Sequence, residues 1–138
     1  MLTAVNSIAN NGIMMAPRLT VGESREEGRP ISAETAKTIT NMMVSAVKIN
    51  VLADIKGYDV AGKTGTAMVP DFDKGGYRDS YINTFIGFAP AYDPKFSILV
   101  RIDEPEGNPL AGASVIPPFK ELAEFILSYY GVAPDNIR

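Results

Sequence analysis

The residues best suited to chemistry lie in the stretch GYDVAGKTGTA, residues 57–67, and they fit two patterns. Residues 57–64 match G-x-x-x-x-G-K-[ST], in which a glycine-rich loop wraps phosphates and a helix begins at the Lys-Ser/Thr pair. The triplet Lys63-Thr64-Gly65 suits another chemistry if it lies on a strand. Glycine then lets a second backbone approach, while the ammonium and hydroxyl groups can hold a carboxylate. The two patterns require opposite secondary structures.

The neighbouring residues favour the strand. Glycine and proline at positions 65, 70, 75 and 76 are too dense for a helix to begin at Lys63. Tyr58 and Val60 favour extended backbone where a P-loop needs a phosphate cradle. The sequence therefore predicts a strand over about 58–67 and a loop over 68–80, and it leaves a P-loop nucleotide-binding protein as the least favoured alternative.

The composition excludes several classes of protein. The chain has 138 residues, 46% hydrophobic and 21% charged, which is typical of a globular domain. The formal net charge is −3 and no Lys/Arg cluster occurs, so we expect no nucleic-acid partner. With 0 Cys and 0 His, thiol catalysis, a Cys/His zinc site and a Ser-His-Asp triad are excluded. We expect neither a metal nor a cofactor.

No segment predicts membrane insertion or export. The longest apolar runs fall far short of the roughly 20 residues that a membrane-spanning helix needs. The N-terminal residues, MLTAVNSIANNG, lack the basic region and the small-residue cleavage site of a signal peptide. We therefore expect no targeting signal and no membrane segment in this chain.

Hydrophobic periodicity predicts an α+β fold in which helices pack on an antiparallel sheet of three strands. Helical spacing predicts helices over 1–11, 32–48 and 117–130, with Ser32 as the N-cap of the second. Alternation of apolar and polar residues predicts strands over 81–89 and 96–103, joined by a hairpin-length connection. Residues 13–21 are expected to be extended, and residues 22–30 to form a charged loop.

Four segments together resemble the transpeptidase domain of class B penicillin-binding proteins. They are AGKTGTA (61–67), INTFIGFAPAYDPKFSILVRIDEP (82–105), LTAVNSIANNGIMMAPRL (2–19) and VIPPFKELAEFIL (115–127). They cover nearly the whole chain in the order found in the family. The resemblance implies that residues 1–138 form the C-terminal portion of such a domain, with a partial penicillin-binding/serine β-lactamase-like fold.

The resemblance also implies a function, namely acyl transfer that cross-links peptidoglycan. In this family a serine of an S-x-x-K motif attacks a D-Ala–D-Ala peptide, with its lysine as base and an S-x-N motif assisting. It implies that Lys63, Thr64, Gly65 and Thr66 bind substrate. Lys63 would also be catalytic, and the Thr66 backbone N–H would be an oxyanion donor. Implied partners are the stem peptide, β-lactams and a missing N-terminal part of the same protein, at the extracytoplasmic face of the bacterial cell membrane.

One S-x-x-K is present, Ser45 to Lys48, but we do not expect it to hold the nucleophile. Helical projection places Ser45 and Lys48 opposite the apolar stripe of their helix. Only 14 residues separate Lys48 from Lys63, and no S-x-N occurs. We therefore expect the isolated chain to be inactive and to supply only the substrate-binding strand. The alternative is a non-catalytic module that binds D-Ala-ended peptides or a partner protein through that strand.

Overall fold

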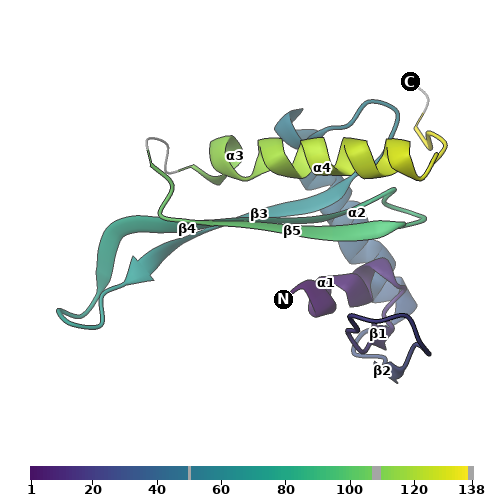
Figure 1. Cartoon of the computed structure of the whole chain (residues 1–138), viewed down its shortest axis with the longest axis horizontal. Coiled ribbons are helices and arrows are strands. Elements are labelled where there is room, and N and C mark those ends of the chain that lie inside the picture. The colour runs from purple at the N-terminus through teal and green to yellow at the C-terminus, as the bar shows by residue number, and fades with distance from the viewer. Residues whose placement is uncertain (50, 107–109, 137–138) are drawn as a thin grey trace.

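A three-stranded antiparallel sheet lies between helices (Figure 1). The computed structural model describes residues 1–49, 51–106 and 110–136. One helix, α4, lies along one face of the sheet, and α1 lies against the other. The elements are α1 (Leu2–Ala9), β1 (Met14–Met15), β2 (Glu26–Gly28), α2 (Ala33–Ile49), the short 3₁₀ helix η1 (Val51–Ala53), β3 (Ala61–Pro70), β4 (Tyr77–Ala89), β5 (Phe96–Asp103), α3 (Ala111–Ser114) and α4 (Ile116–Tyr129).

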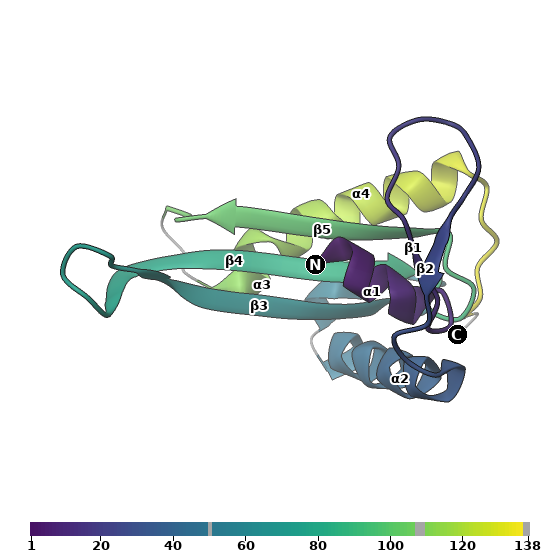
Figure 2. The same cartoon turned by 90° about the horizontal axis from the view of Figure 1, so that it is seen from below.

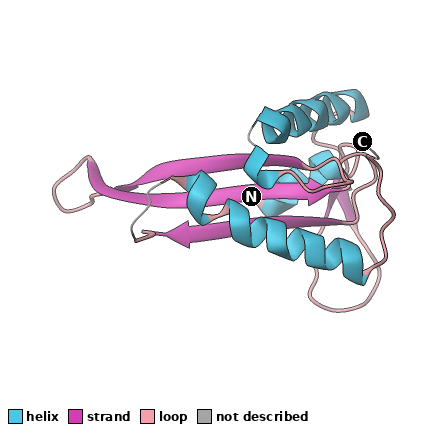
Figure 3. Ribbon diagram, turned by 90° about the horizontal axis from the view of Figure 1, so that it is seen from above, coloured by secondary structure: helices cyan, strands magenta, loops and turns pink. Residues whose placement is uncertain are grey.

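The sheet has the order β3-β4-β5, so β3 pairs on one side only. In the register of the ladders, Thr64 lies opposite Phe85, and Phe85 lies opposite Val100. Cross-strand partners share a face, so these three side chains all point toward α4. The far part of the β3–β4 hairpin projects beyond the helices (Figures 1 and 3).

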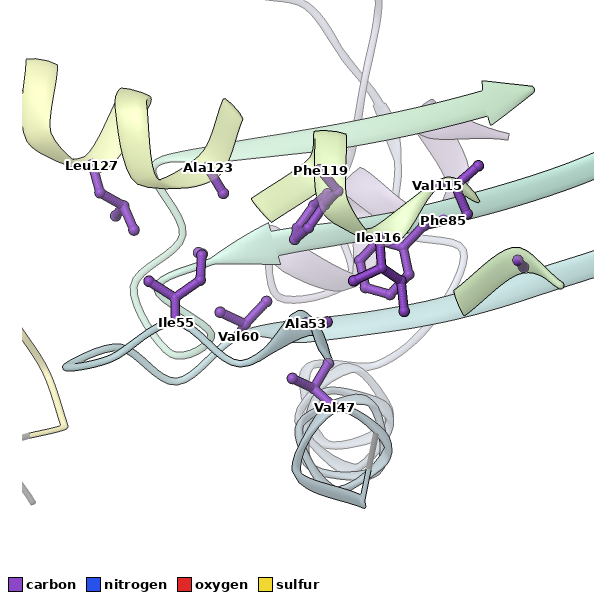
Figure 4. Close-up of a cluster of buried hydrophobic side chains, with 12 residues drawn as sticks. Val47, Ala53, Ile55, Val60, Phe85, Val115, Ile116, Phe119, Ala123 and Leu127 are labelled. Carbon is purple, nitrogen blue, oxygen red and sulfur yellow. The ribbon is translucent and has the colours of Figure 1, made fainter. Parts of the chain in front are cut away.

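The core between the sheet and α4 depends on two glycines. Phe85 packs on Phe119 of α4 with ring centroids 4.4 Å apart (Figure 4). Gly62 and Gly87 lie opposite each other on β3 and β4. A Cβ at Gly62 would lie 2.4 Å from the Phe85 ring, and one at Gly87 would lie 2.9 Å from the Phe119 ring. Both glycines therefore make room for an aromatic ring. The buried members of this cluster are Val47, Ala53, Ile55, Val60, Phe85, Ala89, Ala111, Val115, Ile116, Phe119, Ala123 and Leu127.

A second apolar cluster lies on the other face of the sheet. Its buried members are Met43, Val44, Ala61, Phe88 and Ala91, and residues of α1 pack against them. Helix α2 contributes to both clusters, since its Val47 belongs to the first. Helix α2 therefore passes beside the first residues of β3 from one face of the sheet to the other (Figures 1 and 2).

Several predicted elements agree with the structure. The strand predicted over 96–103 is β5, and the helix predicted over 32–48 is α2 within one residue at each end. Ser32 acts as the expected cap, because its Oγ accepts a hydrogen bond from the Thr35 backbone N–H at 3.0 Å. The predicted α+β class, with three antiparallel strands, is confirmed.

Other boundaries were wrong. The loop predicted over 68–80 is mostly strand, because the β3–β4 ladder continues to a turn at 71–76, where Gly75 and Gly76 supply φ values of +77° and +79°. The strand predicted from residue 58 begins at Ala61, since Tyr58 bridges Ile55 locally. The first helix ends at Ala9, before the positive φ of Asn11 and Gly12.

Some short elements were missed. The segments predicted as extended and as a charged loop contain the short pair β1 and β2. The last helix begins at Ile116, one residue before its predicted start, and the short α3 precedes it. Among the described residues, no helix has both the length and the apolar character needed to cross a bilayer.

Candidate functional site

The site residues predicted from the sequence all lie on β3, the edge strand whose other side is open. Lys63 and Thr66 are exposed, and Thr64 and Gly65 are half-buried. Ala61 and Gly62, just before them, are buried. The strand therefore begins inside the core and then emerges with its K-T-G triplet beside solvent.

The hydrogen bonds of the triplet show which backbone groups face the open edge. The Gly65 carbonyl faces β4, since Thr84 Oγ1 donates to it at 3.5 Å. The Thr64 carbonyl instead accepts a hydrogen bond from Lys63 Nζ at 2.8 Å. Backbone groups of successive strand residues point to alternate sides. The N–H and C=O groups of Thr64 and Thr66 therefore face the open edge, where another extended chain can pair with them.

Lys63 carries the positive charge of this edge. Its ammonium group forms no ion pair with any residue in the described part of the chain, and its one hydrogen bond is to the Thr64 carbonyl. Thr64 and Thr66, on the same strand, add two hydroxyl groups. An exposed ammonium group, two hydroxyls and outward N–H groups together suit a carboxylate at the end of an extended peptide.

A small cavity of about 260 Å³ adjoins the triplet. Lys63 and Thr64 of β3 line it together with residues at the end of α2. Its remaining lining is apolar, so the charged group lies beside a surface that suits a small apolar substituent. The apolar and glycine residues that line it are Ala46, Val47, Ile49, Ala53, Gly62 and Phe85.

The structure gives Ser45 and Lys48 separate partners. Ser45 is exposed, and its Oγ donates to the Asn41 carbonyl of its own helix at 2.9 Å. Lys48 Nζ lies 3.0 Å from Asp59 Oδ1. The expectation that both residues lie on a solvated helix face is confirmed.

The P-loop alternative is wrong. Its Lys63 and Thr64 lie inside strand β3, which continues to Pro70, so no helix N-terminus is available to bind phosphate. Sequence reasoning also missed Asp59, which the structure places at a junction just before β3. Its partner Asp135 is 76 residues away, and no local pattern marks the pair.

Comparisons with known proteins agree with this geometry. Residues 1–124 match the family model described as penicillin binding protein transpeptidase domain. The chain is 35% identical to penicillin-binding protein PbpB of Mycolicibacterium smegmatis, over 98% of this chain and 25% of PbpB. It is 34% identical to the probable peptidoglycan D,D-transpeptidase PenA of Neisseria meningitidis, over 95% of this chain and 23% of PenA.

Solved structures give the same result. The TP domain of Burkholderia pseudomallei penicillin-binding protein 3 superposes with a TM-score of 0.83 at 28% identity, over 99% of this chain and 43% of that one. Penicillin-binding protein 3 of Mycobacterium tuberculosis, complexed with ampicillin, superposes with a TM-score of 0.82 at 30% identity, over 99% of this chain and 35% of that one.

An antiparallel sheet between helices, with K-T-G on its edge strand, is the α+β arrangement of penicillin-recognising proteins. This chain belongs to the transpeptidase family of class B penicillin-binding proteins. It spans about a quarter of the length of the curated relatives named above, 25% and 23%.

Proposed function

We propose that the chain is the C-terminal portion, residues 1–138, of a peptidoglycan D,D-transpeptidase domain and supplies its substrate-binding strand. The observation that carries the proposal is the open edge of β3, where Lys63 forms no ion pair with a described residue and the backbone groups of Thr66 point outward. The ampicillin and aztreonam complexes of the Mycobacterium tuberculosis relative support β-lactam binding by the complete domain.

In this proposal the edge strand holds the substrate while another part of the protein reacts with it. A serine outside this chain attacks the carbonyl carbon of the penultimate D-Ala. The peptide bond breaks, the terminal D-Ala leaves as an amine that takes up the serine proton, and an acyl-ester remains. An amine of a second stem peptide then displaces the serine. A β-lactam acylates the same serine by ring opening, with no leaving group lost.

Each residue of the triplet has a separate task in this scheme. Lys63 provides positive potential for the terminal carboxylate, and the Thr64 and Thr66 hydroxyls hydrogen-bond it. Gly65 leaves the strand free of a side chain where the substrate backbone pairs. The Thr66 N–H, which faces the open edge, donates to the oxyanion, a type of contact worth about 3 kcal/mol. We place the complete protein at the extracytoplasmic face of the bacterial cell membrane, where peptidoglycan is built.

Fluorescent penicillin labelling tests the proposal. The chain is extended with its upstream coding sequence, and labelling rates are compared for wild type, Lys63→Ala and Ser45→Ala. We expect Lys63→Ala to slow acylation about 10- to 100-fold, as expected for the loss of a hydrogen bond to a charged group. Ser45→Ala is the matched control and keeps the wild-type rate. Equal losses in both variants refute the assignment of the site.

The same experiment separates the proposal from a non-catalytic module. Such a module binds a D-Ala–D-Ala peptide through β3 in a titration but forms no covalent adduct with penicillin, even with the upstream sequence present. An adduct on an upstream serine, located by peptide mass spectrometry, supports the transpeptidase.

A further inference from the structure

The residues that lead into β3 are tied to the last residues that the structure describes. The Tyr58 hydroxyl donates a hydrogen bond to the Val132 carbonyl at 2.5 Å. The backbone N–H groups of Asp135 and Asn136 both donate to the Gly57 carbonyl, each at 3.1 Å. These bonds fasten residues 132–136, which we call the C-terminal tail, to the segment just before the candidate site.

Asp59 joins this tail to two other parts of the fold. Its backbone N–H donates to Asp135 Oδ1 at 2.9 Å, and its Oδ1 accepts a hydrogen bond from Asn136 Nδ2 at 2.7 Å. The same oxygen lies 3.0 Å from Lys48 Nζ, in the last turn of α2. The Asp59 carbonyl accepts the Ala91 N–H at 2.8 Å, in the connection between β4 and β5. One residue therefore links the tail, α2, the sheet and the entry to β3.

The position of Asp59 makes these links relevant to the candidate site. At about 3.3 Å per residue of extended chain, Lys63 lies roughly 13 Å further along. Val60 and Ala61, between them, are 2% and 0% exposed, so the start of the strand is held in the core and cannot absorb a shift. Through Lys48, the same carboxylate fixes the end of α2, whose Ile49 and Val47 line the cavity beside Lys63.

We propose that the C-terminal tail and Asp59 position both walls of the candidate site, the β3 edge and the end of α2. Tyr58, Asp59 and Asn136 are positioning residues that act through Lys63 and Thr64. Lys48, the lysine of the S-x-x-K match, takes part because its ion pair with Asp59 connects α2 to the C-terminal tail. The functional part of the inference rests on the proposed transpeptidase, since penicillin acylation is its readout.

The first measurement follows β3 itself. Amide hydrogen exchange over residues 58–66 is measured in the 138-residue chain at about 10 °C, near the temperature of maximum stability of typical domains. The variants are Tyr58→Phe and Asn136→Ala, and the control is Tyr130→Phe, which removes a hydroxyl that makes no hydrogen bond to any described residue. We expect about fivefold faster exchange at the start of β3 in both variants, the factor that one net hydrogen bond represents. The control should exchange like wild type.

The second measurement follows the reaction in the upstream-extended protein. The acylation rate at saturating fluorescent penicillin is measured well below the unfolding temperature, where every variant is folded. A merely structural loss leaves this rate unchanged, whereas displaced site walls lower it, by up to about 100-fold for a misplacement of about 1 Å. Asn136→Gln, which keeps the amide, should recover part of the rate.

Unchanged β3 exchange in both variants overturns the inference. Faster exchange with an unchanged saturating acylation rate overturns it too, because the tail then stabilises the fold without positioning the site. A wild-type extended protein that never reacts with penicillin refutes the proposed function, while the exchange measurement still decides whether the tail holds β3.

Discussion

Substitution of Gly62 by alanine tests the close packing of β3, the strand that carries the candidate site, against the Phe85 ring. The new Cβ would lie 2.4 Å, 2.9 Å and 3.3 Å from three atoms of the Phe85 ring. Phe85 is 2% exposed and packs on Phe119 at 4.4 Å, so its ring cannot turn away without moving α4. We expect Gly62→Ala to destabilise the protein.

The magnitude follows from two opposing effects. Overpacking a tight core by one methyl group costs about 1–3 kcal/mol. The φ of Gly62 lies outside the left-handed region, so alanine meets no backbone strain. It therefore also gains about 0.4–1 kcal/mol by restricting the unfolded chain. The net expectation is a loss of about 1–2 kcal/mol in the free energy of unfolding.

Urea unfolding followed by far-UV circular dichroism measures this loss, since the chain has 0 Trp for fluorescence. Gly65→Ala is the matched control. Its Cβ would meet the Thr84 Oγ1 at 2.5 Å, but that atom ends a half-buried side chain that can rotate, so the change should stay within about 0.5 kcal/mol. In a Phe85→Leu background, Gly62→Ala should cost about 1 kcal/mol less. Equal stability of Gly62→Ala and wild type, or no coupling to Phe85, refutes the packing argument.

Three further predictions concern the reactivity of the isolated chain, its thermal stability and one charged pair on β5. The isolated 138-residue chain should not be acylated by fluorescent penicillin, and a covalent adduct on any of its serines, Ser45 first, would contradict this. Its stability should be marginal, because the β3–β4 hairpin projects beyond the helices, so a cooperative thermal transition above about 60 °C would show a self-sufficient domain. Arg101 hydrogen-bonds Asp103 and holds the pKa of that carboxyl below its ordinary value. The small stability this contributes is present above the unfolded pKa and is lost as pH falls through the folded one. Arg101→Gln should therefore raise the Asp103 pKa in a carboxyl NMR titration, and an unchanged value would exclude the pair in solution.

The elements that the sequence predicts well have strong periodic signals. Strand β5 alternates Phe96, Ile98, Val100 and Ile102 toward α4, and it was predicted with its observed ends. Helix α2 has both an apolar stripe and Ser32 as a cap. The K-T-G triplet could be placed on a strand because glycine and proline after it exclude a helix.

The elements that were mispredicted depend on contacts that no local pattern encodes. The outer part of the β3–β4 hairpin is mostly exposed, and its residues 67–70 (AMVP) and 77–80 (YRDS) do not alternate between apolar and polar. Hydrophobic periodicity therefore gives no signal there, and the pairing of the two strands orders it. Tyr58 and Val60 are typical strand residues, yet the Asp59 N–H between them bonds Asp135 instead of a neighbouring strand. The ion pair of Lys48 could not be predicted for the same reason, since its partner Asp59 lies outside α2.

The open edge of β3 also affects how the protein behaves at high concentration. A strand of 10 residues with one side unpaired is a template for any extended chain, including another copy of itself. Lysine on such an edge opposes self-pairing, because two copies would bring their ammonium groups together and strip them of water. The exposed Lys63 therefore opposes self-association, in addition to the carboxylate binding proposed for it. Its replacement by alanine should promote aggregation, and the two effects are separated only when activity is compared at equal concentrations of monomer.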